Sequence, residues 1–162
     1  LSPATSTGGT MTIDLKSVTH DRWHLAVPSD WKYAYPEEPE VALLAMPKHA
    51  TEDRFAPNVV LTPIVYPQVP PRLEYLTATV DMLESTLGDI LPIAATIDGH
   101  DEETYTANVV IGYRVGTFNV TAWQRHLVHG NTALIATFTC ANSEVPELAE
   151  TAIAVLESAG VR

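Results

Sequence analysis

Residues 104–140 read TYTANVVIGYRVGTFNVTAWQRHLVHGNTALIATFTC, and this stretch predicts three long strands in succession. Residues 104–113, 118–127 and 132–140 are rich in the β-branched and aromatic residues that are typical of strands. Short turns around Gly116 and Gly130 separate them. A parallel return would need a crossover of about a dozen residues or more, so connections this short force neighbouring strands to be antiparallel. We therefore expect an antiparallel meander.

Two amphipathic segments predict helices, one before and one after the meander. In residues 72–87, apolar side chains recur at spacings of three and four, and Gly88 follows as a stop signal. The second predicted helix, residues 144–159, follows Ser143 as the expected N-cap, and Gly160 comes after it as the stop signal. The expected buried stripes are Leu73, Leu76, Val80, Leu83 and Leu87 in the first helix, and Val145, Leu148, Ala149, Ala152, Ile153 and Leu156 in the second.

Shorter apolar runs predict the remaining strands, at residues 23–27, 41–46, 58–66 and 93–97. The predicted order is three strands, a helix, four strands and a second helix. Because each helix must bury its apolar stripe against the sheet, we expect an α+β fold: a mainly antiparallel sheet flanked by two helices, as an α/β/α sandwich. Residues 11–162 contain no repeat or linker, which favours a single domain.

Composition limits the classes of partner. The 162 residues carry a net charge of -11, from 20 acidic and 9 basic side chains, and this charge opposes binding to nucleic acid. No apolar run approaches the roughly 20 residues of a membrane span, so the sequence predicts no transmembrane helix. Cys140 is the only cysteine, which excludes an intrachain disulfide. Its place at the end of an apolar run favours a buried, inert thiol.

The beginning of the chain bears on location. Residues 1–10 are rich in Ser, Thr, Gly and Pro, as in a flexible linker or an expression-derived segment. The chain starts at Leu1 without an initiator Met. If a signal or anchor segment precedes Leu1, we expect an extracytoplasmic location in the cell envelope. If Met11 is the native start, we expect a cytoplasmic protein.

Three aromatic residues form the most prominent candidate contact site. Trp31, Tyr33 and Tyr35 recur with period two and would share one face of an extended segment. Aromatic side chains with polar tips are favoured at recognition surfaces, so these residues are candidates for contact with a protein partner or an apolar ligand. The alternative is that they cover the edge of the sheet or cap the core.

Residues of the types that bind metals or catalyse reactions do not form a recognisable site in the sequence. His126 and His129 are three residues apart, a spacing that puts them on opposite faces of a strand, so solvated side chains are favoured over joint metal ligation. The acidic loop at residues 98–103 lacks the ligand spacing of an EF-hand, which favours a solvated loop. The chain has no Gly-x-Ser-x-Gly elbow and no glycine-rich phosphate loop. We therefore expect no catalytic residue, no cofactor and no metal site.

Residues 23–31, WHLAVPSDW, and residues 55–60, FAPNVV, resemble the LpqN-type lipoprotein family of actinobacteria. The resemblance extends from about residue 11 to residue 161 and implies a Mog1/PsbP-like fold, many of whose members are adaptors, binding modules or chaperones without an active site. It implies no catalytic residue. Asn58 matches the Pro-Asn step of the family, and we expect its side chain to bond nearby backbone. The lipobox cysteine of these lipoproteins is absent from this chain, which leaves its location open.

Three hypotheses about function follow. The leading one is a non-enzymatic binding or accessory module of the cell envelope that contacts a protein or an apolar ligand. The second is a cytoplasmic adaptor or chaperone that starts at Met11 and shields an apolar segment of a client protein. The third is a hydrolase or metal-dependent enzyme that uses His100, His126 or His129, which requires at least two of these side chains to converge in a pocket.

Overall fold

The computed structural model describes residues 13–37 and 40–162, and these residues form ten strands and two α-helices. The predicted linker at residues 1–10 and the alternative start at Met11 lie outside the described residues.

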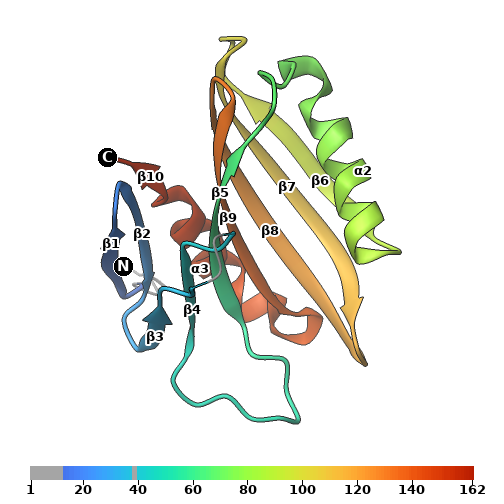
Figure 1. Cartoon of the computed structure of the whole chain (residues 1–162). Coiled ribbons are helices and arrows are strands. Elements are labelled where there is room, and N and C mark those ends of the chain that lie inside the picture. Colours follow the sequence, from blue (N-terminus) through green and yellow to red (C-terminus); the bar gives the residue numbers. More distant parts are fainter. Residues whose placement is uncertain (1–12, 38–39) are drawn as a thin grey trace, which may run out of the picture.

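The central layer is a seven-stranded antiparallel sheet in the order β3-β4-β5-β9-β8-β7-β6 (Figure 1). The predicted meander is confirmed as β7, β8 and β9, with tight turns between them. Both β7 and β8 continue two residues beyond their predicted ends. The strands of this sheet are β3 (Trp31–Ala34), β4 (Leu43–Pro47), β5 (Asn58–Val65), β6 (Leu91–Asp98), β7 (Thr104–Val115), β8 (Phe118–His129) and β9 (Thr132–Ala141).

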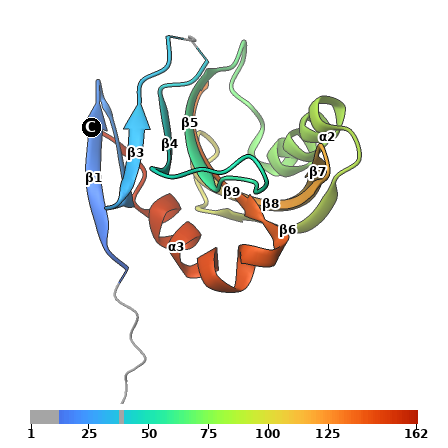
Figure 2. The same cartoon turned by 90° about the horizontal axis from the view of Figure 1, so that it is seen from below.

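A second, three-stranded sheet lies beside β3 and consists of β1 (Leu15–His20), β2 (Trp23–Pro28) and β10 (Gly160–Val161), in the order β1-β2-β10 (Figures 1 and 2). Only β2 was predicted. In β1, Val18 is the one fully buried residue, so the strand has almost no apolar alternation, and β10 has only two residues. The sequence signal for both strands is therefore weak.

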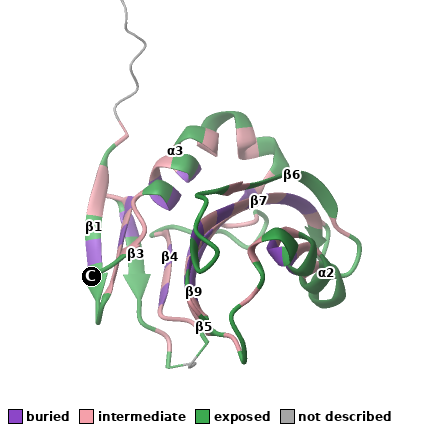
Figure 3. Cartoon of the chain, turned by 90° about the horizontal axis from the view of Figure 1, so that it is seen from above, coloured by how far each residue is buried: buried purple, intermediate pink, exposed green. Residues whose placement is uncertain are grey.

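The two helices are α2 (Tyr75–Leu87) and α3 (Val145–Glu157), and they cover opposite faces of the large sheet (Figures 2 and 3). The side chains of β8 alternate accordingly. Ala122 and Val128 lie in the apolar clusters under α2, whereas Trp123 and Leu127 pack into the cluster under α3. The predicted α+β sandwich is confirmed.

The predicted helix faces are partly wrong. A turn of 3-10 helix precedes each α-helix, at Arg72–Glu74 and Asn142–Glu144, so each helix starts later than predicted. Leu73 therefore lies before α2 and is 82% exposed, Leu87 is also exposed, and Tyr75 and Thr79 take the most buried positions. In α3, Val155 is buried and Ile153 is 49% exposed, the reverse of the expected stripe. Ser143 lies in the 3-10 turn and forms no capping hydrogen bond.

The largest apolar cluster fills the space between the large sheet, α3 and the small sheet. Phe138 and Cys140 of β9 lie at its centre with no exposed surface. Burial raises the pKa of the Cys140 thiol to about 11, so the thiol is protonated at neutral pH. The predicted burial of Cys140 is confirmed.

Ser158 ties the end of α3 to the small sheet. Strand β10 pairs with β2 only at Trp23 and His24. Beyond them, the backbone N–H of Ala26 donates to Ser158 Oγ at 2.8 Å, and Ser158 Oγ in turn donates to Val155 O. The serine hydroxyl therefore continues the strand pairing where β10 has not yet begun.

We expect Ser158→Ala to lower the free energy of unfolding by about 1–3 kcal/mol, because it leaves the N–H of Ala26 without its partner. Ser143→Ala is the matched control, since Ser143 is exposed and caps nothing; it should change the free energy by about 0.5 kcal/mol or less. Urea denaturation followed by circular dichroism measures both. Equal effects of the two substitutions would show that Ser158 does not hold the small sheet.

Candidate functional site

Trp31 is a core residue, so its predicted place on a contact surface is wrong. Its side chain is 6% exposed and its ring stacks on Phe138, with the ring centroids 5.7 Å apart. Trp31 begins β3 where the small sheet covers the large one, and it belongs to the cluster under α3. Trp31 and Tyr33 therefore differ in exposure although their spacing puts them on the same face of the strand.

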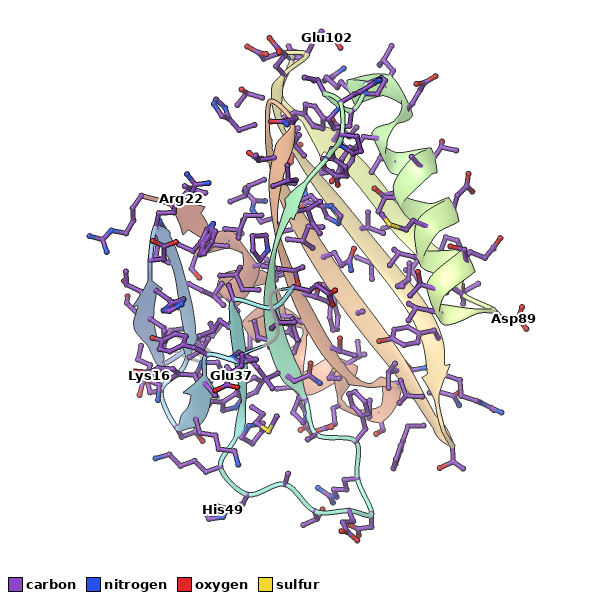
Figure 4. All side chains as sticks on the ribbon, viewed as in Figure 1. Lys16, Arg22, Glu37, His49, Asp89 and Glu102 are labelled. Atoms are coloured by element: carbon purple, nitrogen blue, oxygen red, sulfur yellow. The ribbon has the colours of Figure 1, made fainter. Side chains whose placement is uncertain are left out.

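Tyr33 and Tyr35 are exposed, at 45% and 43%, with ring centroids 5.9 Å apart. Tyr33 lies in β3, the edge strand of the large sheet, and Tyr35 follows directly after the end of that strand. Lys16 of β1 lies over the Tyr33 ring, with Nζ 5.3 Å from the ring centroid. The His20 ring stacks on the Tyr35 ring, with the ring centroids 4.0 Å apart. Figure 4 shows Lys16 at the level of β3. We call Lys16, His20, Tyr33 and Tyr35 the β1–β3 patch.

Side chains of the β1–β3 patch also bridge the two sheets. Lys16 Nζ donates to the carbonyl of Trp31, and Tyr35 Oη donates to the carbonyl of Thr19 at 3.4 Å. The bond to Thr19 holds Tyr35 in place, and the bond from Lys16 covers a backbone carbonyl of an edge strand that would otherwise be free to pair. The patch is thus both an edge cover and a rigid, exposed aromatic surface.

His126 is buried, so the expected solvated side chain is wrong at this position. It is 1% exposed because β8 continues to His129 and places His126 inside the ladder, under α2. Its Nδ1 lies 2.7 Å from Tyr75 Oη, and its Nε2 lies 2.8 Å from Gln124 Oε1. Tyr66 Oη lies a further 2.8 Å from Tyr75 Oη. Four side chains, two from β8, one from α2 and one from the segment after β5, therefore form a polar relay.

The hydrogen bonds from Tyr75 to His126 and from His126 to Gln124 run in the same direction, and the side chains that form them are uncharged. A carbonyl oxygen only accepts, so His126 Nε2 donates to Gln124, and Nδ1 accepts from Tyr75. Burial lowers the pKa of His126 to about 4 and raises the pKa of Tyr75. Both groups are therefore neutral at neutral pH and fasten α2 to the sheet. One sequence signal could have revealed the relay: the polar residues Gln124 and His126 share a strand face with the apolar residues Ala122 and Val128.

The three histidines of the enzyme hypothesis lie apart. His129 is exposed on the face opposite His126, with Nδ1 3.0 Å from Thr104 Oγ1, so the predicted opposite orientation is confirmed. His100 is exposed in the loop after β6. Within residues 13–37 and 40–162, no three His, Cys, Asp or Glu side chains form a group that could hold a metal ion. The convergence that the enzyme hypothesis requires is not found.

The acidic loop after β6 is shaped by hydrogen bonds to its own backbone. Asp101 Oδ1 accepts from the N–H groups of Glu103 and Thr104, at 2.8 and 3.2 Å. Arg72 Nε and Nη2 donate to the carbonyl of Gly99, whose positive φ of 103° suits glycine. Glu102 points outward from the end of this hairpin in Figure 4. These contacts fit the expected solvated loop.

Asn58 has the structural role that was predicted for it. Its Nδ2 donates to the carbonyl of Ala56 at 3.1 Å, which fixes the entry into β5. Phe55, just before it, lies against Phe118, with ring centroids 6.2 Å apart. The FAPNVV segment thus fastens the long loop before β5 to the end of the meander.

We expect Trp31→Ala to destabilise the protein by about 3–5 kcal/mol, because it empties a filled core position. Tyr33→Ala, two residues away, should change the free energy of unfolding by about 1 kcal/mol or less, because the ring is half exposed. Thermal and urea denaturation of the two variants test this contrast. A loss at Tyr33 as large as that at Trp31 would contradict the division into core and surface.

The lowered pKa of His126 predicts an acid-dependent stability. An unfolded histidine binds a proton below about pH 6.5, whereas the folded one does so only near pH 4. The free energy of unfolding should therefore fall as the pH drops from about 6.5 to about 4, by up to about 3 kcal/mol from this residue.

His126→Gln removes that contribution, so the stability difference between wild type and variant should shrink as the pH falls through this window. His129→Gln is the control, and its difference from wild type should not follow that course because His129 is exposed. Urea denaturation at a series of pH values gives both differences. A wild-type advantage over His126→Gln that stays constant with pH would contradict the assignment.

No helix in the part of the chain that the structure describes is both long and apolar enough to cross a membrane. No protein-family model matches the sequence. No curated protein matches it either.

Solved structures do match. Cyanobacterial PsbP (CyanoP) from Synechocystis sp. PCC 6803 superposes with a TM-score of 0.67 at 13% identity, over 98% of each chain. LpqN of Mycobacterium tuberculosis, described as involved in cell envelope biogenesis, gives 0.61 at 15% identity, over 91% of this chain and 90% of LpqN. A Pseudomonas aeruginosa protein of unknown function gives 0.55 at 11% identity, over 85% of this chain and 90% of its own. These likenesses establish that the chain has a PsbP-like α+β fold.

Proposed function

We propose that this protein is a non-enzymatic accessory or binding module of the cell envelope, related to the LpqN-type lipoproteins, and that it contacts a partner protein through the β1–β3 patch. Two independent likenesses support the relationship: the segments WHLAVPSDW and FAPNVV in the sequence, and the superposition on LpqN over nine-tenths of both chains. The involvement of LpqN in cell envelope biogenesis supports the location.

The exposed tyrosine pair carries the proposal. Two aromatic rings, each more than two-fifths exposed, lie 5.9 Å apart at the end of an edge strand. Tyrosine supplies a large contact area with few rotatable bonds, and buried aromatic anchors dominate the binding energy of most interfaces.

The surroundings of the pair reduce the entropy lost on binding. Stacking of His20 on Tyr35, the position of Lys16 over Tyr33 and the Tyr35 hydroxyl bond to Thr19 hold the rings before any partner arrives. Lys16 and His20 also place cationic or titratable groups beside the rings of a protein whose net charge is -11. We expect the partner to present an apolar surface bordered by acceptor or acidic groups.

Site-specific photo-crosslinking tests the proposal. A benzophenone side chain replaces Tyr33 in one variant and Leu73, which is 82% exposed on the α2 side, in the control. In the cells that naturally produce the protein, position 33 should yield a discrete adduct with an envelope protein, and position 73 should not. Fractionation should find the adduct with the cell envelope.

The same adduct from both positions, or none from position 33 while the protein is folded and abundant, would contradict a partner at the patch. An adduct with a cytoplasmic protein would contradict the envelope location and favour the cytoplasmic adaptor.

A further inference from the structure

A second surface, on the α3 face of the large sheet, combines polar and apolar groups in one recess. Helix α3 packs against β2, β8 and β9, and β7 and β6 continue the sheet beyond it. Figure 3 shows β6 as exposed. A cavity of about 350 Å³ opens where α3 meets β7 and β8. The side chains that matter for its chemistry are Asp98, Asn108, Trp123, Arg125, Ile153 and Glu157.

Arg125 enters this cavity with most of its hydrogen-bonding capacity unused. Its Nη1 donates to Asn108 Oδ1 at a long 3.3 Å, and its Nε is buried without a partner among residues 13–37 and 40–162. A guanidinium carries five N–H donors in a planar fork that matches a carboxylate. Asn108 Nδ2 donates to Asp98 Oδ2 at 3.2 Å, which turns the amide oxygen of Asn108 toward Arg125.

The charges in the cavity have both signs. Asp98 and Glu157 line it together with Arg125, so the side chains supply one cation and two carboxylates. This balance opposes a phosphate or any other ligand of purely negative charge. It suits a ligand that carries both charges, with an anionic group for Arg125 and a cationic group for the two acids.

The remaining lining is apolar. Trp123 is held edge-on against Phe138, with ring centroids 6.1 Å apart. Ile153 is 49% exposed although it belongs to the helix that packs on the sheet, so an apolar surface stays open beside Arg125. The volume lies near the lower end of the range for small-ligand sites, which is roughly 300–1,000 Å³. The size therefore suits a single small molecule.

We propose that this cavity binds a zwitterionic apolar α-amino acid, with its carboxylate on Arg125, its ammonium group toward Asp98 and Glu157, and its side chain against Trp123 and Ile153. This site is separate from the β1–β3 patch, so it stands or falls independently of the proposed function.

Three probes with the same phenyl body isolate the two charges: L-phenylalanine, 3-phenylpropionate, which lacks the ammonium group, and 2-phenylethylamine, which lacks the carboxylate. Isothermal titration calorimetry, with tryptophan fluorescence as a second readout, should show L-phenylalanine binding about tenfold or more tightly than either relative, since each charged hydrogen bond contributes at least that factor.

Arg125→Gln should reduce the affinity for L-phenylalanine by about tenfold or more while leaving 2-phenylethylamine unchanged. Asp98→Asn should lower the affinity for L-phenylalanine and for 2-phenylethylamine, which both carry an ammonium group, and should leave the affinity for 3-phenylpropionate unchanged. Arg114→Gln, an exposed arginine on β7 outside the cavity, is the matched control and should bind as wild type does.

Near-UV circular dichroism checks that each variant is folded, and the three probes on the wild type decide the matter if one is not. Equal affinity for the three probes, no binding of L-phenylalanine at millimolar concentration, or unchanged binding by folded Arg125→Gln would overturn the proposal.

Discussion

The backbone ladder through β7, β8 and β9 is the interaction on which the rest of the structure depends. Strand β8 pairs along its whole length with β7, from Phe118 to His129, and with β9 from Val120 to His129. Because the ladder fixes the register, it also fixes which side chains face each helix. The clusters under α2 and α3 contain alternate residues of these strands, and the other strands extend the same sheet outward.

The sequence was most informative where the ladder is longest, and least informative at its edges. The meander was predictable because strand composition and tight turns agree at Gly116 and Gly130, both of which adopt positive φ. Strand β1 escaped prediction because Val18 is its one buried residue, and β10 because it has only two residues, so neither strand carries a clear local pattern. The stripe of the first helix was partly wrong because Leu73 lies in the 3-10 turn before α2, a boundary that spacing alone does not reveal. In α3 the spacing also fits a stripe through Val155, and packing on the sheet, not local pattern, buries Val155 and leaves Ile153 exposed.

The candidate sites show the same division between local pattern and long-range contact. Periodicity placed Trp31 and Tyr33 on one face, but only the position of the small sheet decides that Trp31 is buried and Tyr33 is exposed. His126 was recognisable as a strand residue, yet its neutral relay needs Tyr66 and Tyr75, which are fifty or more residues away. The two candidate sites lie on different parts of the sheet. The β1–β3 patch lies at the edge strand β3, whereas Arg125 of the α3-side cavity belongs to the central ladder.

Hydrogen exchange measured residue by residue by NMR tests most directly whether the β7–β8–β9 ladder is the scaffold. If it is, the amides of β8 should exchange slowest, with a free energy equal to that of global unfolding, while those of β1, β3 and β6 exchange through smaller local openings. Protection in β8 no greater than in these outer strands would contradict the account.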